Sequence, residues 1–317
     1  MKTVAGFWHW TNEMSKELET DVLKGVSRSF YLSLRFLPSA MRRPASIAYL
    51  LARLSDTIAD SVSASADERL SALEHFSQQV KGEVDAVAIP ESLIDGAANS
   101  SEKRLLRESV LLIAAMNSLA PEQQFLIQEV IDTITSGQRL DIERFELAEG
   151  GAIQVLSAVG DLDDYTWRVA GCVGLFWTRL GFLTMGAKFS NRSQDELEDL
   201  AVEYGKGLQL VNILRDLPED LRAGRCYLPV NDPTDDVEVF AQFRHWREMA
   251  SQKISYGRQY SEALRTKRLR VASVMPAAIG ELTLCLLGVA SLDDLQPRVK
   301  VSRKSVYRIL LREIAFG

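Results

Sequence analysis

Two short stretches of this chain each place a pair of aspartates four residues apart beside an arginine. They are Arg53-Leu-Ser-Asp56-Thr-Ile-Ala-Asp60 and Asn212-Ile-Leu-Arg215-Asp216-Leu-Pro-Glu219-Asp220. Residues i and i+4 share one face of a helix, so each pair can present two carboxylates to one cation. Mg²⁺ prefers oxygen ligands and is usually held by one or two carboxylates together with substrate phosphates. Two such stretches facing each other would form a cage for a diphosphate.

The spacing of the aspartates does not define a site by itself. Asp195 and Asp199 repeat it in an acidic first helical turn, where carboxylates complement the helix dipole. Asp232 and Asp236 repeat it in a polar loop. Neither of these pairs needs a ligand, so they serve as internal controls.

The 53–60 and 212–220 stretches differ from the controls because they lie beside apolar helical patterns. The apolar residues are Ile47, Leu50, Leu51, Leu54 and Ile58 for the first stretch and Leu208, Val211, Ile213 and Leu214 for the second. Charges beside apolar faces are costly unless they are paired or bound to metal. Arg53 and Arg215 could neutralise the carboxylates as ion-pair partners, or they could bind phosphate oxygens through the planar guanidinium group.

The composition is typical of a soluble globular protein. The 317 residues are 46% hydrophobic and 25% charged, and a net charge of −6 argues against nucleic acid as the main partner. The three cysteines lack a Cys-x-x-Cys pair, so neither zinc nor a disulfide framework is predicted, and the cytoplasm is the expected location. The N-terminus lacks the apolar core of a signal peptide, and residues 169–177 are too few to span a bilayer. No transmembrane segment is expected.

The sequence predicts helices almost throughout, with no linker to divide the chain. One all-α domain over residues 1–317 is therefore expected. Pro44 is expected to open the helix that carries the first aspartate pair. Further helices are predicted over residues 67–81, 101–119, 121–144, 163–185, 193–217, 237–263, 269–288 and from 302 onward.

Proline and glycine residues add two expectations about the backbone. Pro218 lacks an N–H, so the helix of the second aspartate pair is expected to end or kink there. Asp220 would then leave that helix face, and Glu219 competes with it as a ligand. Gly171 and Gly174 indicate a close approach to the backbone, either by a neighbouring helix or by a ligand, and helix packing is the favoured interpretation.

Five ordered blocks make the chain similar to the squalene/phytoene synthases, a family that joins two prenyl diphosphates head to head. The blocks are Ser27-Arg28-Ser29-Phe30, Tyr49 with Arg53 to Asp60, Tyr165 to Gly174, Gln209 to Asp220, and Gly224-Arg225-Cys-Tyr227-Leu-Pro229. The resemblance covers nearly the whole chain. It implies an all-α, isoprenoid-synthase-type helical bundle around a central cavity, with aspartate-rich helices on opposite walls and Mg²⁺ between them.

The resemblance also implies roles for individual residues. The implied metal ligands are Asp56, Asp60, Asn212, Asp216 and Asp220, and these four aspartates act in catalysis together with Tyr165, which handles a proton or stabilises a cation. The implied substrate-binding residues are Ser27, Arg28, Tyr49, Arg53, Gln209, Arg215, Arg225 and Tyr227. Two positions depart from the family. Ala59 stands where many members are acidic, and Pro218 stands where proline is unusual.

The implied reaction begins with Mg²⁺-assisted ionisation of an allylic diphosphate. The first expectation is that two farnesyl diphosphates form squalene through presqualene diphosphate. Four alternative products stay open: phytoene from two geranylgeranyl diphosphates, dehydrosqualene, hydroxysqualene and presqualene diphosphate. The length of the substrate depends on the depth of the cavity, which side chains such as Leu34 and Ser46 set. A head-to-tail elongator or class I terpene cyclase would lack the blocks at Tyr165 and Gly224. A non-catalytic helical interaction protein would not need both aspartate pairs.

A basic segment, Arg298-Val-Lys300-Val-Ser-Arg303-Lys304, interrupts an otherwise acidic chain. It could attract phosphate at the mouth of a cavity, or it could bind the 2′-phosphate of NADPH. It is similar to a basic segment of the reductive squalene synthases, with one more residue between lysine and arginine. NADPH is therefore a second expected cofactor beside Mg²⁺. Peripheral membrane association for product release is a further expectation.

Overall fold

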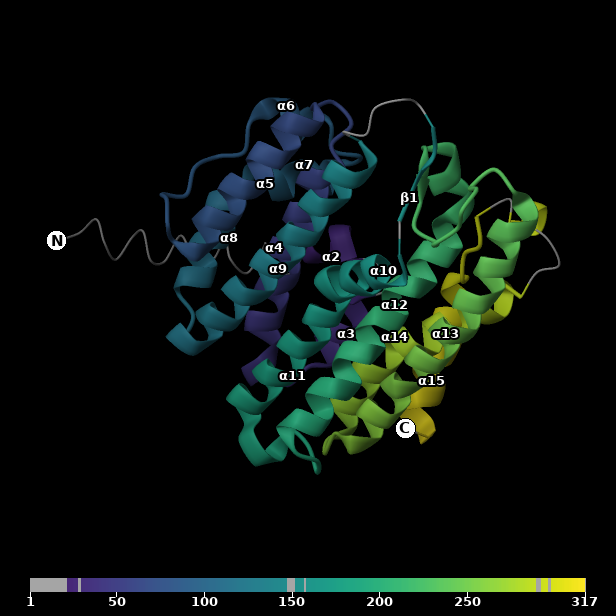
Figure 1. The fold of residues 1–317 in the computed structure, drawn as a ribbon. Helices are drawn as coiled ribbons and strands as arrows, with labels where there is room; N and C mark the ends of the chain where they lie inside the picture. The colour runs from purple at the N-terminus through teal and green to yellow at the C-terminus, as the bar shows by residue number, and fades with distance from the viewer. Residues whose placement is uncertain are drawn as a thin grey trace. The chain divides into compact units, whose positions relative to one another are not determined.

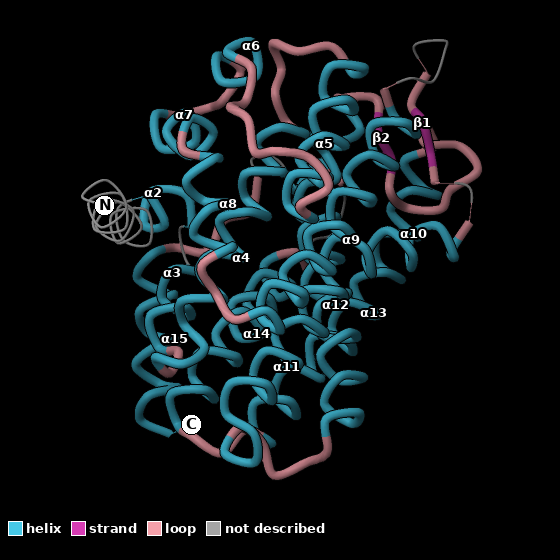
Figure 2. Tube along the Cα trace, turned by 90° about the vertical axis from the view of Figure 1, so that its left-hand side faces the viewer, coloured by secondary structure: helices cyan, strands magenta, loops and turns pink. Residues whose placement is uncertain are grey.

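The structure is a computed structural model of the chain, and it describes residues 22–27, 30–146, 152–156, 158–288, 292–295 and 298–316. The chain divides into two compact units, Met1–Ile142 and Glu143–Gly317, called here the N-terminal and C-terminal units. Helices form nearly all of the described parts of both units, which confirms the all-α prediction (Figure 1, Figure 2). The single domain over residues 1–317 stays a prediction.

The N-terminal unit is built around a long buried helix, α4 (Ser39–Ala59). Its apolar face includes Ile47, Leu50 and Leu51, all of which are fully buried. The other helices of the unit are α2 (Leu23–Ser27), α3 (Phe30–Phe36), α5 (Ala66–Lys81), α6 (Glu91–Asp95), α7 (Ser100–Arg107), α8 (Ser109–Asn117) and most of α9 (Pro121–Phe145). Helices α5, α7 and α8 pack against α4, so several elements hold α4 in place.

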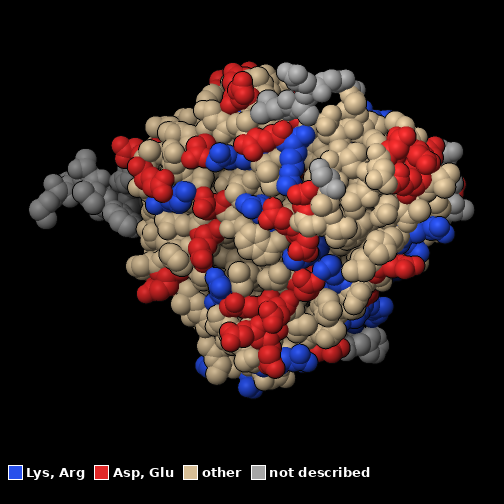
Figure 3. All heavy atoms as spheres, in the orientation of Figure 1, with Lys and Arg blue, Asp and Glu red and all other residues tan. Residues whose placement is uncertain are grey.

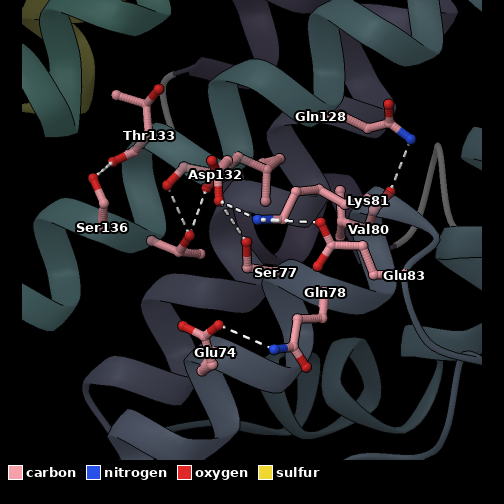
Figure 4. A network of polar contacts seen from close by, with 12 residues as sticks. Glu74, Ser77, Gln78, Val80, Lys81, Glu83, Gln128, Asp132, Thr133 and Ser136 are labelled. Carbon is pink, nitrogen blue, oxygen red and sulfur yellow. Dashed lines mark hydrogen bonds and ion pairs between the residues drawn. The ribbon is translucent and has the colours of Figure 1, made fainter.

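A polar network joins α5 to α9 and keeps α9 in place (Figure 4). Asp132 accepts a 2.8 Å hydrogen bond from the Ser77 hydroxyl and pairs with the Lys81 ammonium at 3.0 Å. One turn away, the Gln128 amide donates to the Val80 carbonyl at 3.1 Å. These bonds tie together two helices that begin more than fifty residues apart. They fix the helix that carries Gln138, which is described below.

The C-terminal unit is centred on α12 (Gln194–Arg222), which packs against α11 (Cys172–Met185) and α13 (Asp236–Ala263) (Figure 1). The remaining elements are β1 (Gln154–Val155), α10 (Val159–Thr166), the π-helical segment η2 (Trp167–Gly171), η3 (Gly186–Lys188), β2 (Arg225–Cys226), α14 (Lys267–Leu286), η4 (Asp293–Leu295) and α15 (Arg303–Phe316). The two short strands pair in parallel. Figure 3 shows acidic side chains gathered over the lower parts of α11 and α12.

Several predicted elements have the expected bounds. Helix α5 begins with a capping box in which the Ser65 hydroxyl and the Glu68 carboxylate each bind the other's backbone N–H. Helix α9 begins at Pro121, where proline costs no helical hydrogen bond. Gly174 lies so close to the Ala201 carbonyl of α12 that a Cβ would clash with it. This confirms helix packing as the reason for that glycine.

Three expectations about helix bounds were wrong. Pro44 does not open its helix, because α4 already starts at Ser39, after Pro38. The helix predicted over 101–119 is two helices, since Glu108 adopts a non-helical backbone between α7 and α8. The helix predicted over 193–217 continues through Pro218 to Arg222. One missing N–H is tolerated there because Leu214, Leu217 and their neighbours are buried in the core of the unit.

Two helical stretches, Val159–Lys188 and Lys267–Leu286, are long and apolar enough to cross a membrane by length and composition alone. The second is mostly buried inside the structure. Core helices of water-soluble proteins pass the same test, so this finding is weak evidence for a membrane span.

Candidate metal–diphosphate sites

The first acidic cluster, Asp56 and Asp60, lies at the C-terminal end of α4. Asp56 occupies the last turn, and Asp60 follows the last helical residue, with its N–H bonded to the Asp56 carbonyl at 2.9 Å. The C-terminal end of a helix carries partial negative charge, which disfavours carboxylates. A bound cation would remove this conflict.

Two residues that the sequence analysis did not identify, Gln138 and Glu102, contact this cluster or its arginine. Gln138, from α9, donates a hydrogen bond of 2.6 Å to Asp56. Arg53 lies 3.6 Å from Asp56 but binds Glu102, from α7, at 2.6 Å. The Nε of Arg53 and the Oε1 of Gln138 are buried atoms with no hydrogen-bond partner among the described residues. A water or a phosphate oxygen could accept a hydrogen bond from the Arg53 Nε–H, whereas the Gln138 Oε1 is an acceptor that suits a water or a cation.

The protonation of Asp56 reflects these surroundings. Desolvation by the surrounding protein raises the pKa of Asp56 to about 6, and the charge of Asp60 acts in the same direction. Arg53 and the Gln138 hydrogen bond lower that pKa, but they do not outweigh desolvation. The side chain still keeps 46% of its surface exposed. Protein therefore crowds the carboxylate without sealing it from solvent or from a cation.

The second acidic cluster, Asp216, Glu219 and Asp220, lies in the last two turns of α12. Because the helix is continuous through Pro218, Asp216 and Asp220 keep the i, i+4 relation of neighbours on one face. This cluster also stands at the negative end of a helix dipole. It therefore shares the electrostatic conflict of the first cluster.

Arginine side chains already neutralise much of the second cluster. Asp216 accepts a bidentate pair of bonds from Arg215, at 2.8 and 2.7 Å. Arg298, from the basic segment before α15, binds Asp216 at 2.6 Å and Glu219 at 3.4 Å. The sequence analysis had linked Arg298 to phosphate, whereas the structure places it against carboxylates. A metal ion would compete with Arg298 for these oxygens.

Asp220 is the most buried member of the second cluster. Its side chain is 14% exposed and pairs with Arg225 at 3.0 Å. Burial raises the pKa of Asp220 to about 6; Arg225 lowers it, while Asp216 and Glu219 add to the increase. Glu219, with 46% of its side chain exposed, contacts Arg298. Both remain available as ligands after reorganisation of their arginine partners.

An aromatic stack lies in the same unit. The rings of Tyr165 and Tyr227 stack at 5.0 Å, and Phe145 packs on Tyr227 at 4.9 Å. Tyr227 directly follows β2, which β1 holds in place, and Tyr165 lies at the end of α10, two residues before the π-helical segment η2. Single π-helical turns are frequent at functional sites. The sequence analysis predicted one continuous helix over 163–185 and did not anticipate this turn.

The other predicted residues are placed as follows. Asn212 donates to Gln209 on the same face of α12 at 3.3 Å, one turn before Asp216. The Tyr49 hydroxyl donates to the Val26 carbonyl at 3.3 Å. Ser27 is the last residue of α2, but its side chain, like the whole of Arg28, lies outside what the structure describes.

The control pairs have structural roles. Asp195 lies in the first turn of α12, behind a capping box formed by Ser193. Asp232 accepts hydrogen bonds from the backbone and hydroxyl of Thr234, which lower its pKa. The control pairs have the same spacing as the two clusters, but they lie at a helix start or in a loop, whereas the clusters lie at helix C-terminal ends beside buried apolar residues.

The donors of both clusters fit a divalent cation of the Mg²⁺ type. Carboxylate and amide oxygens suit this ion, which also keeps positions for phosphate and water. Among the described residues, no three Asp, Glu, His or Cys side chains converge as a ready-made metal cage. Asp56 and Asp60 could hold one ion, and Asn212, Asp216 and Asp220 could hold another, each with part of the coordination shell left for a diphosphate.

The fold and the two aspartate-rich helix ends describe an all-α protein with two acidic clusters suited to divalent cations. The family model for squalene/phytoene synthases matches residues 23–305, so the chain belongs to this family. It is 31% identical over 210 residues to a squalene synthase of Saccharomyces cerevisiae, covering 66% of this chain and 44% of that protein. It is also 31% identical to a presqualene diphosphate synthase of Zymomonas mobilis, covering 69% of this chain and 62% of that protein.

Solved structures give the same fold. A complex of TcSQS with the ligand BPH1237 superposes with a TM-score of 0.77 at 22% identity, covering 95% of this chain and 86% of that one. A dehydrosqualene synthase in complex with a ligand gives a TM-score of 0.66 at 20% identity, covering 98% of each chain. At these identities the likeness concerns the fold alone. It bears out the expected isoprenoid-synthase-type bundle.

Proposed function

We propose that this chain condenses two prenyl diphosphates head to head with the assistance of Mg²⁺. Membership of the squalene/phytoene synthase family supports the reaction class. The observation that carries the proposal is the placing of both acidic clusters at the C-terminal ends of long helices. Carboxylates gathered at the negative end of a helix need a cation, whereas stability alone would favour them at the other end.

Arginine side chains are the groups of this chain suited to hold the diphosphate. Arg215 and Arg225 already present their guanidinium groups to carboxylates within the second cluster. Once the carboxylates bind metal, the same planar donors can take phosphate oxygens in a bidentate manner. When bound, Mg²⁺ would neutralise the leaving diphosphate and so promote ionisation of the allylic C–O bond.

Arg298 has a distinct part in this proposal. It binds Asp216 and Glu219, so it must leave those oxygens before a metal ion can bind them. The released guanidinium then lies within reach of a diphosphate at the same place. Arg298 would thus release the carboxylates of Asp216 and Glu219 to the metal ion and bind the diphosphate of the substrate instead.

The aromatic stack provides the complementary surface for the hydrocarbon. Tyr165, Tyr227 and Phe145 offer ring faces that exclude water and can stabilise an allylic cation. The Tyr165 hydroxyl is the group proposed to handle a proton or to orient the released diphosphate.

For the product, we propose squalene, formed from two farnesyl diphosphates through presqualene diphosphate with hydride from NADPH. The basic segment supports NADPH, because Lys300, Arg303 and Lys304 remain exposed while Arg298 is turned inward. Phytoene, dehydrosqualene, a hydroxylated product and presqualene diphosphate are the alternatives within the family. A presqualene diphosphate synthase and a 15-cis-phytoene synthase are both among its relatives.

A single set of incubations tests the product. Purified chain is mixed with Mg²⁺ and either farnesyl or geranylgeranyl diphosphate, with and without NADPH, and extracts are analysed by mass spectrometry. Squalene formed from farnesyl diphosphate only in the presence of NADPH is the expected result. If NADPH changes neither the rate nor the product, the reductive step is refuted and the observed product assigns the alternative.

A further inference from the structure

Arg53 and Arg215 each lie beside an acidic cluster, but they bind different carboxylates. Arg215 makes a bidentate pair with Asp216, at 2.8 and 2.7 Å, and has no other carboxylate partner within the described part of the chain. Arg53 keeps its Nη1 at 3.6 Å from the Asp56 carboxylate, while its Nη2 donates to Glu102 at 2.6 Å. A carboxylate from another helix, α7, therefore competes with the first cluster for this guanidinium.

Several contacts fix Glu102 in the first turn of α7. Its side chain is 9% exposed, and its Oε2 accepts a hydrogen bond from the Ala98 N–H at 3.1 Å. The Glu102 N–H donates to the Oδ1 of Asn99, the N-cap residue of α7, at 3.1 Å. The first turn of a helix favours a carboxylate, because the N-terminal end of the helix dipole is positive. Helix α7 also packs against α4, so the carboxylate is held in place beside Arg53.

We propose that Glu102 is a positioning residue that keeps the first cluster open to a divalent cation by holding Arg53. An arginine three residues before an aspartate on a helix lies on the same face and can pair with it. Without Glu102, the Arg53 guanidinium would move onto Asp56, and a metal ion would have to displace it. The inference rests on the proposed metal site at the first cluster and names the residue that keeps this site accessible.

The exposure of the two aspartates and the donors of Arg53 agree with this role. Asp56 keeps 46% of its side chain exposed, whereas Asp216, which Arg215 binds, keeps 22%. The Nε–H of Arg53 has no hydrogen-bond partner among the described residues, so the contact with Glu102 leaves part of the guanidinium for another ligand. The phosphate oxygens of the proposed substrate suit this donor. A purely structural ion pair between α7 and α4 would contribute little to stability after the cost of desolvation.

Mn²⁺ binding to the full chain without diphosphate, measured by electron paramagnetic resonance, tests the role of Glu102. Asp56→Asn should weaken this binding and so identifies the first cluster. Glu102→Gln should weaken Mn²⁺ binding by about twofold to fivefold, as for gain of a partly exposed ion pair between Arg53 and Asp56. Glu102→Asp keeps the charge but withdraws the carboxylate from Arg53, so it should also weaken binding. Circular dichroism checks the fold of each variant, and Glu102→Asp provides the test if Glu102→Gln is unfolded.

A double-mutant cycle separates the holding of Arg53 from a direct effect of charge on the metal ion. In an Arg53→Gln background, Glu102→Gln should leave the Mn²⁺ affinity unchanged, because no guanidinium remains to move onto Asp56. Glu108→Gln is the matched control. Glu108 directly follows α7, is 16% exposed and pairs with Arg104 at 2.7 Å, so this variant also removes the carboxylate of a partly buried ion pair. It should bind Mn²⁺ as the unchanged chain does.

The outcomes distinguish this inference from the proposed metal site. Unchanged Mn²⁺ affinity in the folded Glu102 variants, although Asp56→Asn weakens binding, would overturn the role of Glu102 alone. The same follows if Glu102→Gln weakens binding equally in the Arg53→Gln background, or if Glu108→Gln weakens it as much. Mn²⁺ binding that Asp56→Asn does not weaken would instead refute the metal site at the first cluster, and the role of Glu102 with it.

Discussion

The two acidic clusters share a helix position but differ in how they are neutralised. At the end of α4, Arg53 is turned mainly to Glu102, at 2.6 Å, and Asp56 keeps 46% of its side chain exposed. At the end of α12, Arg215 and Arg298 bind Asp216 and Arg225 binds Asp220, so these aspartates are 22% and 14% exposed.

If both clusters bind Mg²⁺ as proposed, the difference predicts two modes of metal binding. The first cluster retains an open carboxylate and can accept a cation with little rearrangement. The second cluster carries its own cations, so metal binding there requires an exchange. The second cluster is therefore expected to bind metal well only together with a diphosphate, which gives the displaced arginines a new anion to bind.

Removing one carboxylate from either cluster should have the largest effect. Asp56→Ala and Asp216→Ala should each lower product formation by about 10²–10³-fold or more, since stabilisation of the leaving group is lost. Helical content should be unchanged, because neither side chain belongs to the core. Asp195→Ala, which alters a control pair, should retain full activity. Near-normal turnover in either site variant would show that its cluster does not bind the metal used in catalysis.

Tyr165→Phe should reduce turnover by about 10²-fold, if the hydroxyl handles a proton or orients the diphosphate. The ring would still stack on Tyr227, so the thermal midpoint should stay close to that of the unchanged chain. Steady-state kinetics and thermal melting measured on the same preparation check both parts. A falling midpoint with turnover per folded molecule preserved would instead make Tyr165 a structural residue.

The pH dependence of metal binding should reflect the protonation of Asp56 in the first cluster and of Asp220 in the second. The pKa values of Asp56 and Asp220 are raised from 3.8 to about 6 in the folded chain. Each protonated carboxyl therefore stabilises the folded, metal-free chain fully below pH 3.8, and this contribution is lost as the pH rises through about 6. Metal binds the deprotonated form, so metal-induced stabilisation has the opposite trend.

The measurement is the rise in thermal midpoint caused by Mg²⁺ with inorganic diphosphate. It should be small at about pH 5 and larger at about pH 8. A larger rise at the lower pH would contradict the assignment of these carboxylates as ligands.

The smallest expected effect tests the exchange at the second cluster. Arg298→Gln should raise the affinity for Mn²⁺, measured by electron paramagnetic resonance without diphosphate, by about twofold to fivefold, as for loss of a partly exposed ion pair. Arg303→Gln changes the net charge equally but lies on the exposed start of α15, so it should have little effect. Equal affinities in the two variants would show that Arg298 does not compete with metal.

Much of the fold could be predicted from local sequence. The capping box of Ser65 and Glu68 and the initial proline of α9 are local signals, and both helices start as predicted. The break at Glu108 and the passage of α12 through Pro218 depend on packing within each unit, which local propensity does not contain. Tertiary burial outweighed the cost of a proline in the second case.

The candidate site was predicted less completely, for a related reason. The aspartates and their adjacent arginines are close in sequence, so their pairing could be anticipated. Glu102, Gln138 and Arg298 each lie 49 or more residues along the chain from the residue that they contact, Arg53, Asp56 and Asp216 respectively. Arg298 had a signal as part of a basic segment, but nothing in the sequence named its carboxylate partners.

Binding of inorganic diphosphate as a function of Mg²⁺ concentration, measured by calorimetry, tests most directly whether the two clusters are metal–diphosphate sites. The unchanged chain should bind diphosphate only when Mg²⁺ is present, and Asp56→Asn and Asp216→Asn should each weaken that binding, with Asp195→Asn as the unaffected control. Diphosphate binding that is equally strong without Mg²⁺, or unchanged in both cluster variants, would contradict this assignment.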